Sequence, residues 1–128
     1  MIRKFKMIKI IFVMISVLFI LFWVMLNLHF KPIIDKYMIY MDFKSYEDGQ
    51  YIGTYNYNDA LYATVEVIIE NGKLVEIELI EHKTGFGKKA KDIINSVLKK
   101  QSTKVDLISG ATYSSKVILL SIEKALED

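Results

Sequence analysis

The residues best suited to chemistry lie in one short stretch, from Asp106 to Ser115. This stretch holds a glycine, a small alanine and several hydroxyl side chains, and an amphipathic segment with helical spacing follows it. The first turn of a helix has backbone N–H groups without helical partners, and the positive end of the helix dipole lies there. Small residues let a phosphate approach these groups, and hydroxyls add donors. The stretch therefore predicts a phosphate site where the last helix begins.

N-capping is the simpler interpretation of the same residues. A Ser or Thr side chain before a helix accepts hydrogen bonds from the N–H groups of its first turn. Capping uses one or two hydroxyls, whereas this stretch offers Ser109, Thr112, Ser114 and Ser115, with Asp106 just upstream. The residue types alone leave both interpretations open.

The elements that must position this stretch form a predicted α+β domain. Residues 61–70 alternate apolar and polar side chains, the period of a strand with one buried face. Asn71-Gly72 then predicts a tight hairpin, because both residues tolerate positive φ, and 75–79 alternate again on the return strand. A short strand follows the turn at Asp48-Gly49. We therefore expect a small antiparallel sheet with one apolar face.

Two helices are expected to cover that face. Apolar residues recur at helical spacing from Ala90 to Leu98, and Lys99-Lys100 suit a helix C-terminus. The same spacing recurs from Ile118 to Leu126. Together the helices bring enough apolar side chains to the strands for a small core.

The N-terminal segment has the length of a membrane span. From Ile10 to Leu26 every residue except Ser16 is apolar, and the segment extends to Leu28. Nineteen helical residues cover about 28 Å, close to the ~30 Å hydrocarbon core of a bilayer. A cleaved secretory signal is the alternative, but its apolar region is shorter and ends in small residues. We therefore expect an uncleaved transmembrane anchor in contact with membrane lipid.

Basic residues predict the orientation of this anchor. Arg3, Lys4, Lys6 and Lys9 precede the span, and Lys and Arg tend to stay on the cytoplasmic side. The expected organisation is a cytoplasmic tail and anchor over 1–28, a juxtamembrane linker over 29–46 and an extracytoplasmic domain over 47–128. Pro32 is expected just past the end of the membrane helix, with a short separate helix over Ile33–Met41.

Charge and composition exclude several classes of protein. The chain carries seven basic and two acidic residues through Lys44, but ten Lys and thirteen acids from Ser45 onward. Because the predicted domain is acidic, nucleic-acid binding is not expected. The chain has no Cys, and His29 and His82 are far apart, so no metal-ligand pattern is present. No pairing of a nucleophile with a base is evident, so a free-standing enzyme is not indicated.

Four motifs together resemble a known family. They are Asp48-Gly49-Gln50-Tyr51-Ile52-Gly53, Asn71-Gly72-Lys73-Leu74, Glu81-His82-Lys83-Thr84-Gly85-Phe86-Gly87 and Asp106-Leu107-Ile108-Ser109-Gly110-Ala111-Thr112. In this order they resemble the FMN-binding domain of the C subunit of the sodium-pumping NADH:quinone oxidoreductase and of the G subunit of the Rnf complex. The resemblance covers about Asp48 to Leu126. One departure is that the middle motif lacks the family's Glu and Pro between Lys83 and Gly85.

The resemblance implies a covalently bound cofactor. In that family the Thr of the last motif carries FMN through a phosphoester, attached by a flavin transferase that uses FAD as donor, and the matching residue is Thr112. Asp106 would be part of what the transferase recognises. The phosphate and ribityl chain would lie against Ser109, Gly110, Ala111, Tyr113, Ser114 and Ser115. Thr84, Gly85 and Gly87 would border the isoalloxazine ring, and His82 either reaches the flavin or is a solvated residue at a strand end.

The sequence therefore predicts a membrane-anchored extracytoplasmic flavoprotein that relays electrons between redox partner proteins. Two alternatives stay open. One is a flavin-dependent reductase module whose partner subunit supplies the substrate site. The other is an anchored interaction or sensor domain that keeps the fold but carries no flavin.

Overall fold

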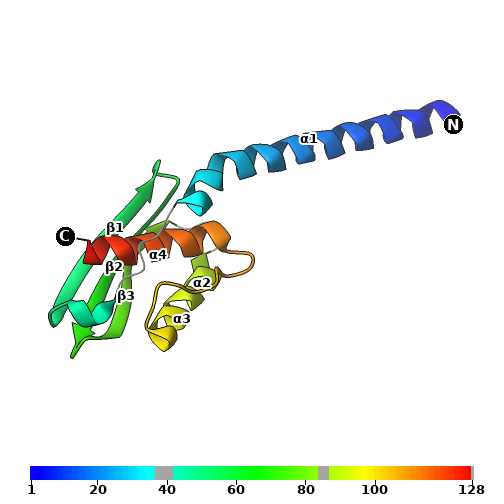
Figure 1. The fold of residues 1–128 in the computed structure, drawn as a ribbon. Helices are drawn as coiled ribbons and strands as arrows, with labels where there is room; N and C mark the ends of the chain where they lie inside the picture. The colour runs from blue at the N-terminus through cyan, green and yellow to red at the C-terminus, as the bar shows by residue number, and fades with distance from the viewer. Residues whose placement is uncertain (37–41, 84–86, 128) are drawn as a thin grey trace. The chain divides into compact units, whose positions relative to one another are not determined.

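The computed structural model describes residues 1–36, 42–83 and 87–127. The chain divides into two compact units, Met1–Pro32 and Ile33–Asp128. The first unit is helical, and the second combines a three-stranded antiparallel sheet with helices (Figure 1). The predicted α+β class is therefore confirmed.

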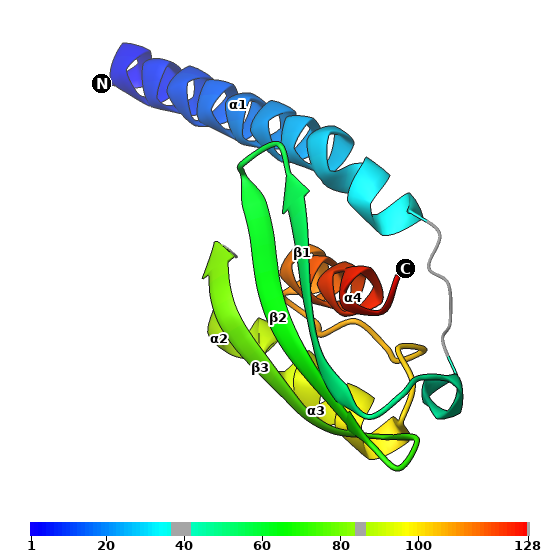
Figure 2. The same cartoon turned by 90° about the vertical axis from the view of Figure 1, so that its left-hand side faces the viewer.

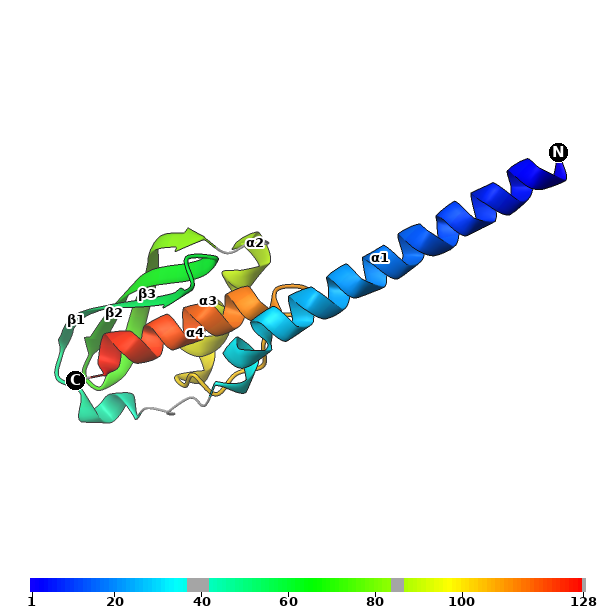
Figure 3. The same ribbon diagram turned by 90° about the horizontal axis from the view of Figure 1, so that it is seen from above.

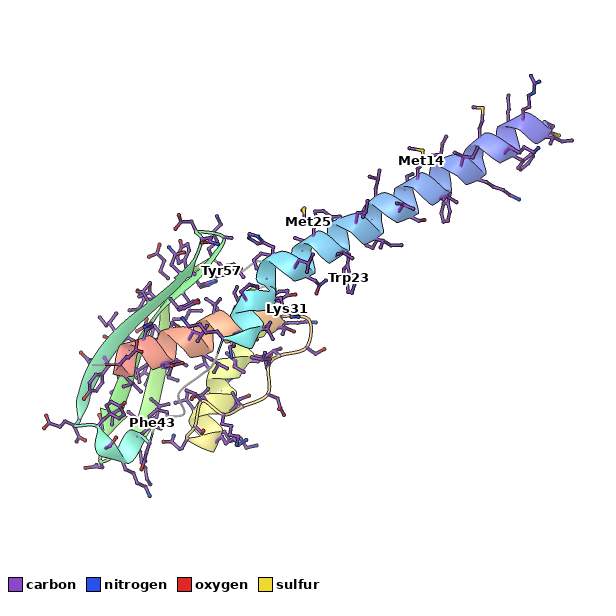
Figure 4. The ribbon with its side chains drawn as sticks, turned by 45° about the horizontal axis from the view of Figure 1, so that its top comes forward. Met14, Trp23, Met25, Lys31, Phe43 and Tyr57 are labelled. Atoms are coloured by element: carbon purple, nitrogen blue, oxygen red, sulfur yellow. The ribbon has the colours of Figure 1, made fainter. Side chains whose placement is uncertain are left out.

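Helix α1, Ile2–Asp35, is long and apolar enough to cross a membrane. Figure 4 shows the side chains of Met14, Trp23 and Met25 projecting outward from this helix. Its two polar side chains near the middle bond to the helix itself. Ser16 Oγ donates to the Phe12 carbonyl at 2.9 Å, and Asn27 Nδ2 donates to the Trp23 carbonyl, also at 2.9 Å. Such internal bonds lower the cost of placing polar groups in lipid.

The expectation that Pro32 lies beyond this helix is wrong. Pro32 lies inside α1, which continues to Asp35. Proline has a φ compatible with a helix, but it lacks an N–H donor and its ring crowds the carbonyl four residues earlier. This disruption is tolerated close to the end of the helix, where few further bonds depend on it. Residues 33–35 are therefore part of α1, and the rest of the separate helix expected up to Met41 lies outside the described residues, apart from Lys36.

Three strands form the sheet, in the order β1-β2-β3. They are β1 (Gly49–Tyr57), β2 (Leu61–Glu70) and β3 (Lys73–Lys83), and each adjacent pair is antiparallel. Alternate residues of β2, from Leu61 to Ile69, are buried on one face, as the alternation predicts. The short 3-10 helix η1, Phe43–Ser45, precedes β1, and its Phe43 is buried.

The hairpin between β2 and β3 confirms the Asn-Gly prediction. Asn71 has φ 53° and Gly72 has φ 71°, the left-handed pair that a tight turn requires. Asp48, at the start of β1, accepts a hydrogen bond from the Asn71 N–H at 2.7 Å. The first two sequence motifs are thus joined to each other and stabilise one end of the sheet.

The helices that follow the sheet in the chain lie on its buried face (Figures 2 and 3). The first expected helix is divided at Lys91 into α2 (Gly87–Ala90) and α3 (Asp92–Lys100). The last helix, α4 (Thr112–Leu126), packs across β1 and β2 and is buried along most of its length. Both expected helical segments are present, the first in two pieces.

A close approach between α4 and β1 depends on Gly53. A Cβ built on Gly53 would overlap Ala125 N and Ser121 O of α4, and it would lie 2.6 Å from Ala125 Cα. The backbone of the helix therefore rests directly on the strand at this point, and only a residue without a side chain fits there.

Gln101 determines where the segment between α3 and α4 begins. It adopts a left-handed conformation, φ 52°, at the end of α3. Its side-chain amide accepts from the Leu74 N–H at 2.9 Å and donates to the Leu74 carbonyl at 2.7 Å. These bonds attach the end of α3 to the edge strand β3.

We predict that Gly53→Ala destabilises the protein by about 3 kcal/mol or more, because the added methyl group pushes α4 off the sheet. The matched control is Gly49→Ala on the same strand, where the nearest atoms to a Cβ would be Tyr51 side-chain atoms at 3.8–4.0 Å. Denaturant unfolding of the full chain in detergent, followed by circular dichroism, measures both. Equal unfolding midpoints for the two variants would contradict the close approach.

Candidate functional site

The stretch singled out by sequence forms a turn that leads into α4. The Ala111 N–H donates to the Ile108 carbonyl at 3.0 Å, which closes the turn. Gly110 within it has φ +80°, a conformation that side chains with a Cβ rarely adopt. Thr112 follows as the first residue of α4 and is exposed. The turn therefore places Thr112, exposed to solvent, at the N-terminus of α4.

The capping interpretation does not describe this terminus. The N-cap position is occupied by Ala111, with φ −139° and ψ 38°, and this residue makes no side-chain capping hydrogen bond. The first turn contains no acidic residue either. A helix of fifteen residues thus begins with neither a capping side chain at its N-cap residue nor a carboxylate in its first turn. This terminus is suited to an external anion.

Ser115 attaches the turn to the helix. Its Oγ donates to the Ala111 carbonyl at 2.6 Å and accepts from the Ile108 N–H at 3.4 Å. Ser115 is fully buried, and Ser114 is 5% exposed. Both hydroxyls were expected to touch the phosphate or ribityl chain, and the structure places them on the inner side of the first turn.

The other residues of the stretch lie on the outside. Ser109, Gly110 and Asp106 are exposed, and Tyr113 is half-buried. Ala111 is buried beneath them. Among the expected site residues in the described part of the chain, Ser109 and Thr112 therefore bring exposed hydroxyls to the terminus of α4.

Lys89 is a neighbour of this turn that the sequence analysis missed. Its Nζ lies 3.7 Å from the position that a Cβ on Gly110 would occupy. Lys89 belongs to α2, twenty-one residues earlier in the chain, and it is exposed. The adjacent pair Lys88-Lys89 directly after Gly87 was the available signal, but a sequence pattern carries no distance between two separate segments.

A pocket of about 600 Å³ adjoins the turn on the side of α3. Residues 105–109, in the segment between α3 and α4, form one wall. Its lining residues are Ser96, Lys99, Lys100, Val105, Asp106, Leu107, Ile108 and Ser109. Asp106 and Ser109, both expected at the site, are therefore brought together here with two basic residues of α3 that the sequence analysis did not assign to it.

The middle motif is only partly described. Thr84 and Gly85, expected to border the flavin ring, lie outside the described residues. Gly87 is the first residue of α2. His82 is exposed near the end of β3 and pairs with Ala63 of β2. The predicted role of this motif stays a prediction.

Lys116 is a second basic residue close to the terminus, one turn beyond Thr112 on α4. Burial lowers the pKa of its ammonium group, and the negative charge of Glu123 opposes part of that shift. Both side chains are largely buried in the domain. Lys116 therefore interacts with a carboxylate of its own helix, unlike the exposed Lys89.

The structure shows a small α+β domain in which a glycine turn leads into the N-terminus of α4. The sequence model of the FMN-binding domain family matches residues 56–127, more than half of the chain. The chain belongs to this family and is a flavin-binding protein. No curated protein matches it.

The turn fits the phosphate of FMN. A Cβ on Gly110 would occupy the space beside Lys89, and the glycine leaves that space open. The uncapped N-terminus of α4 supplies N–H donors, and Thr112 and Ser109 add exposed hydroxyls. Among the described residues, no group of three or more His, Cys, Asp or Glu is placed to hold a metal ion.

We predict that Ser115→Ala destabilises the domain by about 1–2 kcal/mol, because it removes both hydrogen bonds that join the turn to α4. Ser109→Ala, at an exposed position of the same turn, should change the free energy of unfolding by less than about 0.5 kcal/mol. Thermal or denaturant unfolding of the full chain measures the difference. If Ser115→Ala is as stable as Ser109→Ala, the attachment of the turn through Ser115 is refuted.

Proposed function

We propose that this protein carries FMN through a phosphoester on Thr112 Oγ1 and relays electrons between redox partner proteins. The observation that carries the proposal is the exposure of Thr112 at the uncapped N-terminus of α4, directly after a turn that needs glycine. A hydroxyl at that position is accessible to a second protein, and a phosphate bound to it lies against the helix N–H groups.

Attachment requires a donor and a transferase, for which the family resemblance suggests FAD and a flavin transferase. The Thr112 oxygen bonds to the phosphorus of the FMN half of FAD, and the phosphorus–oxygen bond of the pyrophosphate breaks. AMP leaves with that electron pair, and the hydroxyl proton passes to a base of the transferase. Asp106 is exposed four residues before Gly110 and is available for recognition by that enzyme.

The remaining residues of the turn have distinct roles in this proposal. Gly110 and Ala111 keep side chains out of the path of the phosphate, and Ser109 donates from the exposed edge. Ser115 acts from beneath, by holding the turn against the first turn of α4. Ser114 is buried beside it, and Tyr113 is proposed to lie beside the ribityl chain. Thr84, Gly85, Gly87 and His82 remain the proposed border of the ring.

A covalent bond suits a protein outside the cytoplasm. A flavin held with a Kd of ~1 µM and an association rate of about 10⁶ M⁻¹ s⁻¹ leaves in roughly a second and diffuses away. The phosphoester prevents that loss. Bound FMN accepts and donates one or two electrons, and the chain's own residues hold it where partner proteins reach it.

The proposed location is the cell membrane, with α1 as a single-pass anchor. Arg3, Lys4, Lys6 and Lys9 precede its apolar part and favour a cytoplasmic N-terminus. The flavin-binding unit then lies outside the cytoplasm, at the membrane surface.

We predict that Thr112→Val abolishes flavin attachment without unfolding the domain. Valine keeps the β-branched shape and removes the oxygen that forms the phosphoester. Because Ala111 occupies the N-cap position, the stability cost should stay below about 1 kcal/mol. Co-expression with a flavin transferase, followed by denaturing gel electrophoresis and flavin fluorescence, measures attachment.

Ser109→Ala is the matched control, since it removes an exposed hydroxyl from the same turn. It should retain covalent flavin. Fluorescence that persists on Thr112→Val would refute the assignment of the residue. A native protein without flavin under these conditions would refute the flavoprotein proposal and favour an interaction or sensor domain.

We also predict that protease added to intact cells removes the flavin-binding unit and spares the N-terminal tail. Immunodetection with separate tags at the two ends follows the two products. A C-terminal unit that is digested only after lysis would contradict the proposed orientation.

A further inference from the structure

We infer that Lys89 binds the phosphate group of the flavin on Thr112 and speeds its attachment. This inference rests on the proposed function, which places a phosphoester at Thr112. It adds a residue from a different segment of the chain to the turn that precedes α4.

The position of the ammonium group is the first observation. Lys89 Nζ lies 3.7 Å from where a Cβ on Gly110 would be, so it faces the open side of the glycine. Gly110 precedes the first residue of α4 by two positions. A phosphate that approaches the backbone through this open side therefore meets Lys89 as well as the helix terminus.

The second observation is that the positive charge of Lys89 lies near the positive end of the α4 dipole. The start of α4 carries the positive end of its dipole, which disfavours a nearby cation. Lys89 nevertheless lies there, and the first turn of α4 has no acidic residue. Among the described residues, no salt bridge is formed by Lys89. Two positive groups thus lie close together, and the described residues form no salt bridge with Lys89; a phosphate would compensate both charges.

The other lysines near the turn occupy different places. Lys99 and Lys100 line the pocket on the side of α3, together with Asp106. Lys91 is exposed two residues beyond Lys89. Apart from the two residues next to Gly110 in the chain, Lys89 Nζ is the one described atom within 4 Å of the Gly110 Cβ position. Lys89 is therefore distinguished from the surrounding basic residues by the position of its Nζ beside the open side of the glycine.

A charge-assisted hydrogen bond from Lys89 would act at two stages. During attachment, it stabilises negative charge on the phosphate oxygens that do not bond to Thr112. After attachment, it holds the phosphodiester, which keeps one negative charge, against the turn. The first effect changes a rate, and the second changes the electronic environment of the phosphorus.

The test uses the full chain in detergent micelles, with purified flavin transferase and FAD. Lys89→Gln should slow the appearance of covalent flavin at least about tenfold, the loss expected when one charge-assisted bond is removed. Lys89→Arg keeps the cation and should restore the rate to within about threefold. Lys91→Gln removes the same charge from the neighbouring position and should leave the rate unchanged. Thermal unfolding checks that all variants are folded.

The ³¹P resonance of the attached phosphodiester provides a readout independent of the rate. It should shift in Lys89→Gln and stay unchanged in Lys91→Gln. A slower rate with an unchanged ³¹P resonance would assign Lys89 to the docking of the transferase and overturn the inference. Lys89→Gln that loads as fast as Lys91→Gln would also overturn it while leaving the proposed function intact. Failure of the native chain to acquire flavin would instead refute the proposed function itself.

Discussion

The contact between α4 and β1 at Gly53 is the constraint on which the rest of the domain depends. The backbone of α4 lies against the strand at Ser121 and Ala125, which leaves no room for a side chain on Gly53. A helix is rigid over this distance, and Thr112 is nine residues before Ser121, about 14 Å along the axis. The contact at one end of the helix therefore determines where its N-terminus lies.

The N-terminus of α4, where the cofactor is proposed to bind, is less stable than a capped helix terminus would be. A helix without a capping side chain forgoes about 1 kcal/mol. The rest of α4 is buried against β1 and β2, and Ser115 holds the turn, so the helix does not depend on a cap. The open terminus is then compatible with a stable domain, and a bound phosphate would supply the missing negative partner.

The fold was predictable to the extent that local patterns determine it. The alternation in β2 and the Asn71-Gly72 pair define strands and a turn within a few neighbouring residues. The prediction that the first helix ends before Pro32 was wrong, because proline disrupts a helix less near its last turn than in its interior. The break between α2 and α3 at Lys91 was missed, because the apolar spacing continues across it.

The sequence was enough to predict the turn that forms the candidate site, but not the residues that surround this turn. Gly110 and Thr112 belong to one motif, and the motif is visible in the sequence. Burial of Ser115 depends on how α4 is rotated against the sheet. The spacing of the hydroxyl residues along the sequence does not determine that rotation. The approach of Lys89 depends on the path of the chain between α2 and α4. Contacts of this kind require the tertiary structure.

Mass spectrometry of the native protein, purified from cells that contain a flavin transferase, tests the central claim most directly. The intact mass should exceed that of the chain by one FMN less one water, and fragmentation of the peptide spanning 105–116 should place the added mass on Thr112. Added mass on Ser109, Ser114 or Ser115, or an unmodified chain, would contradict the account.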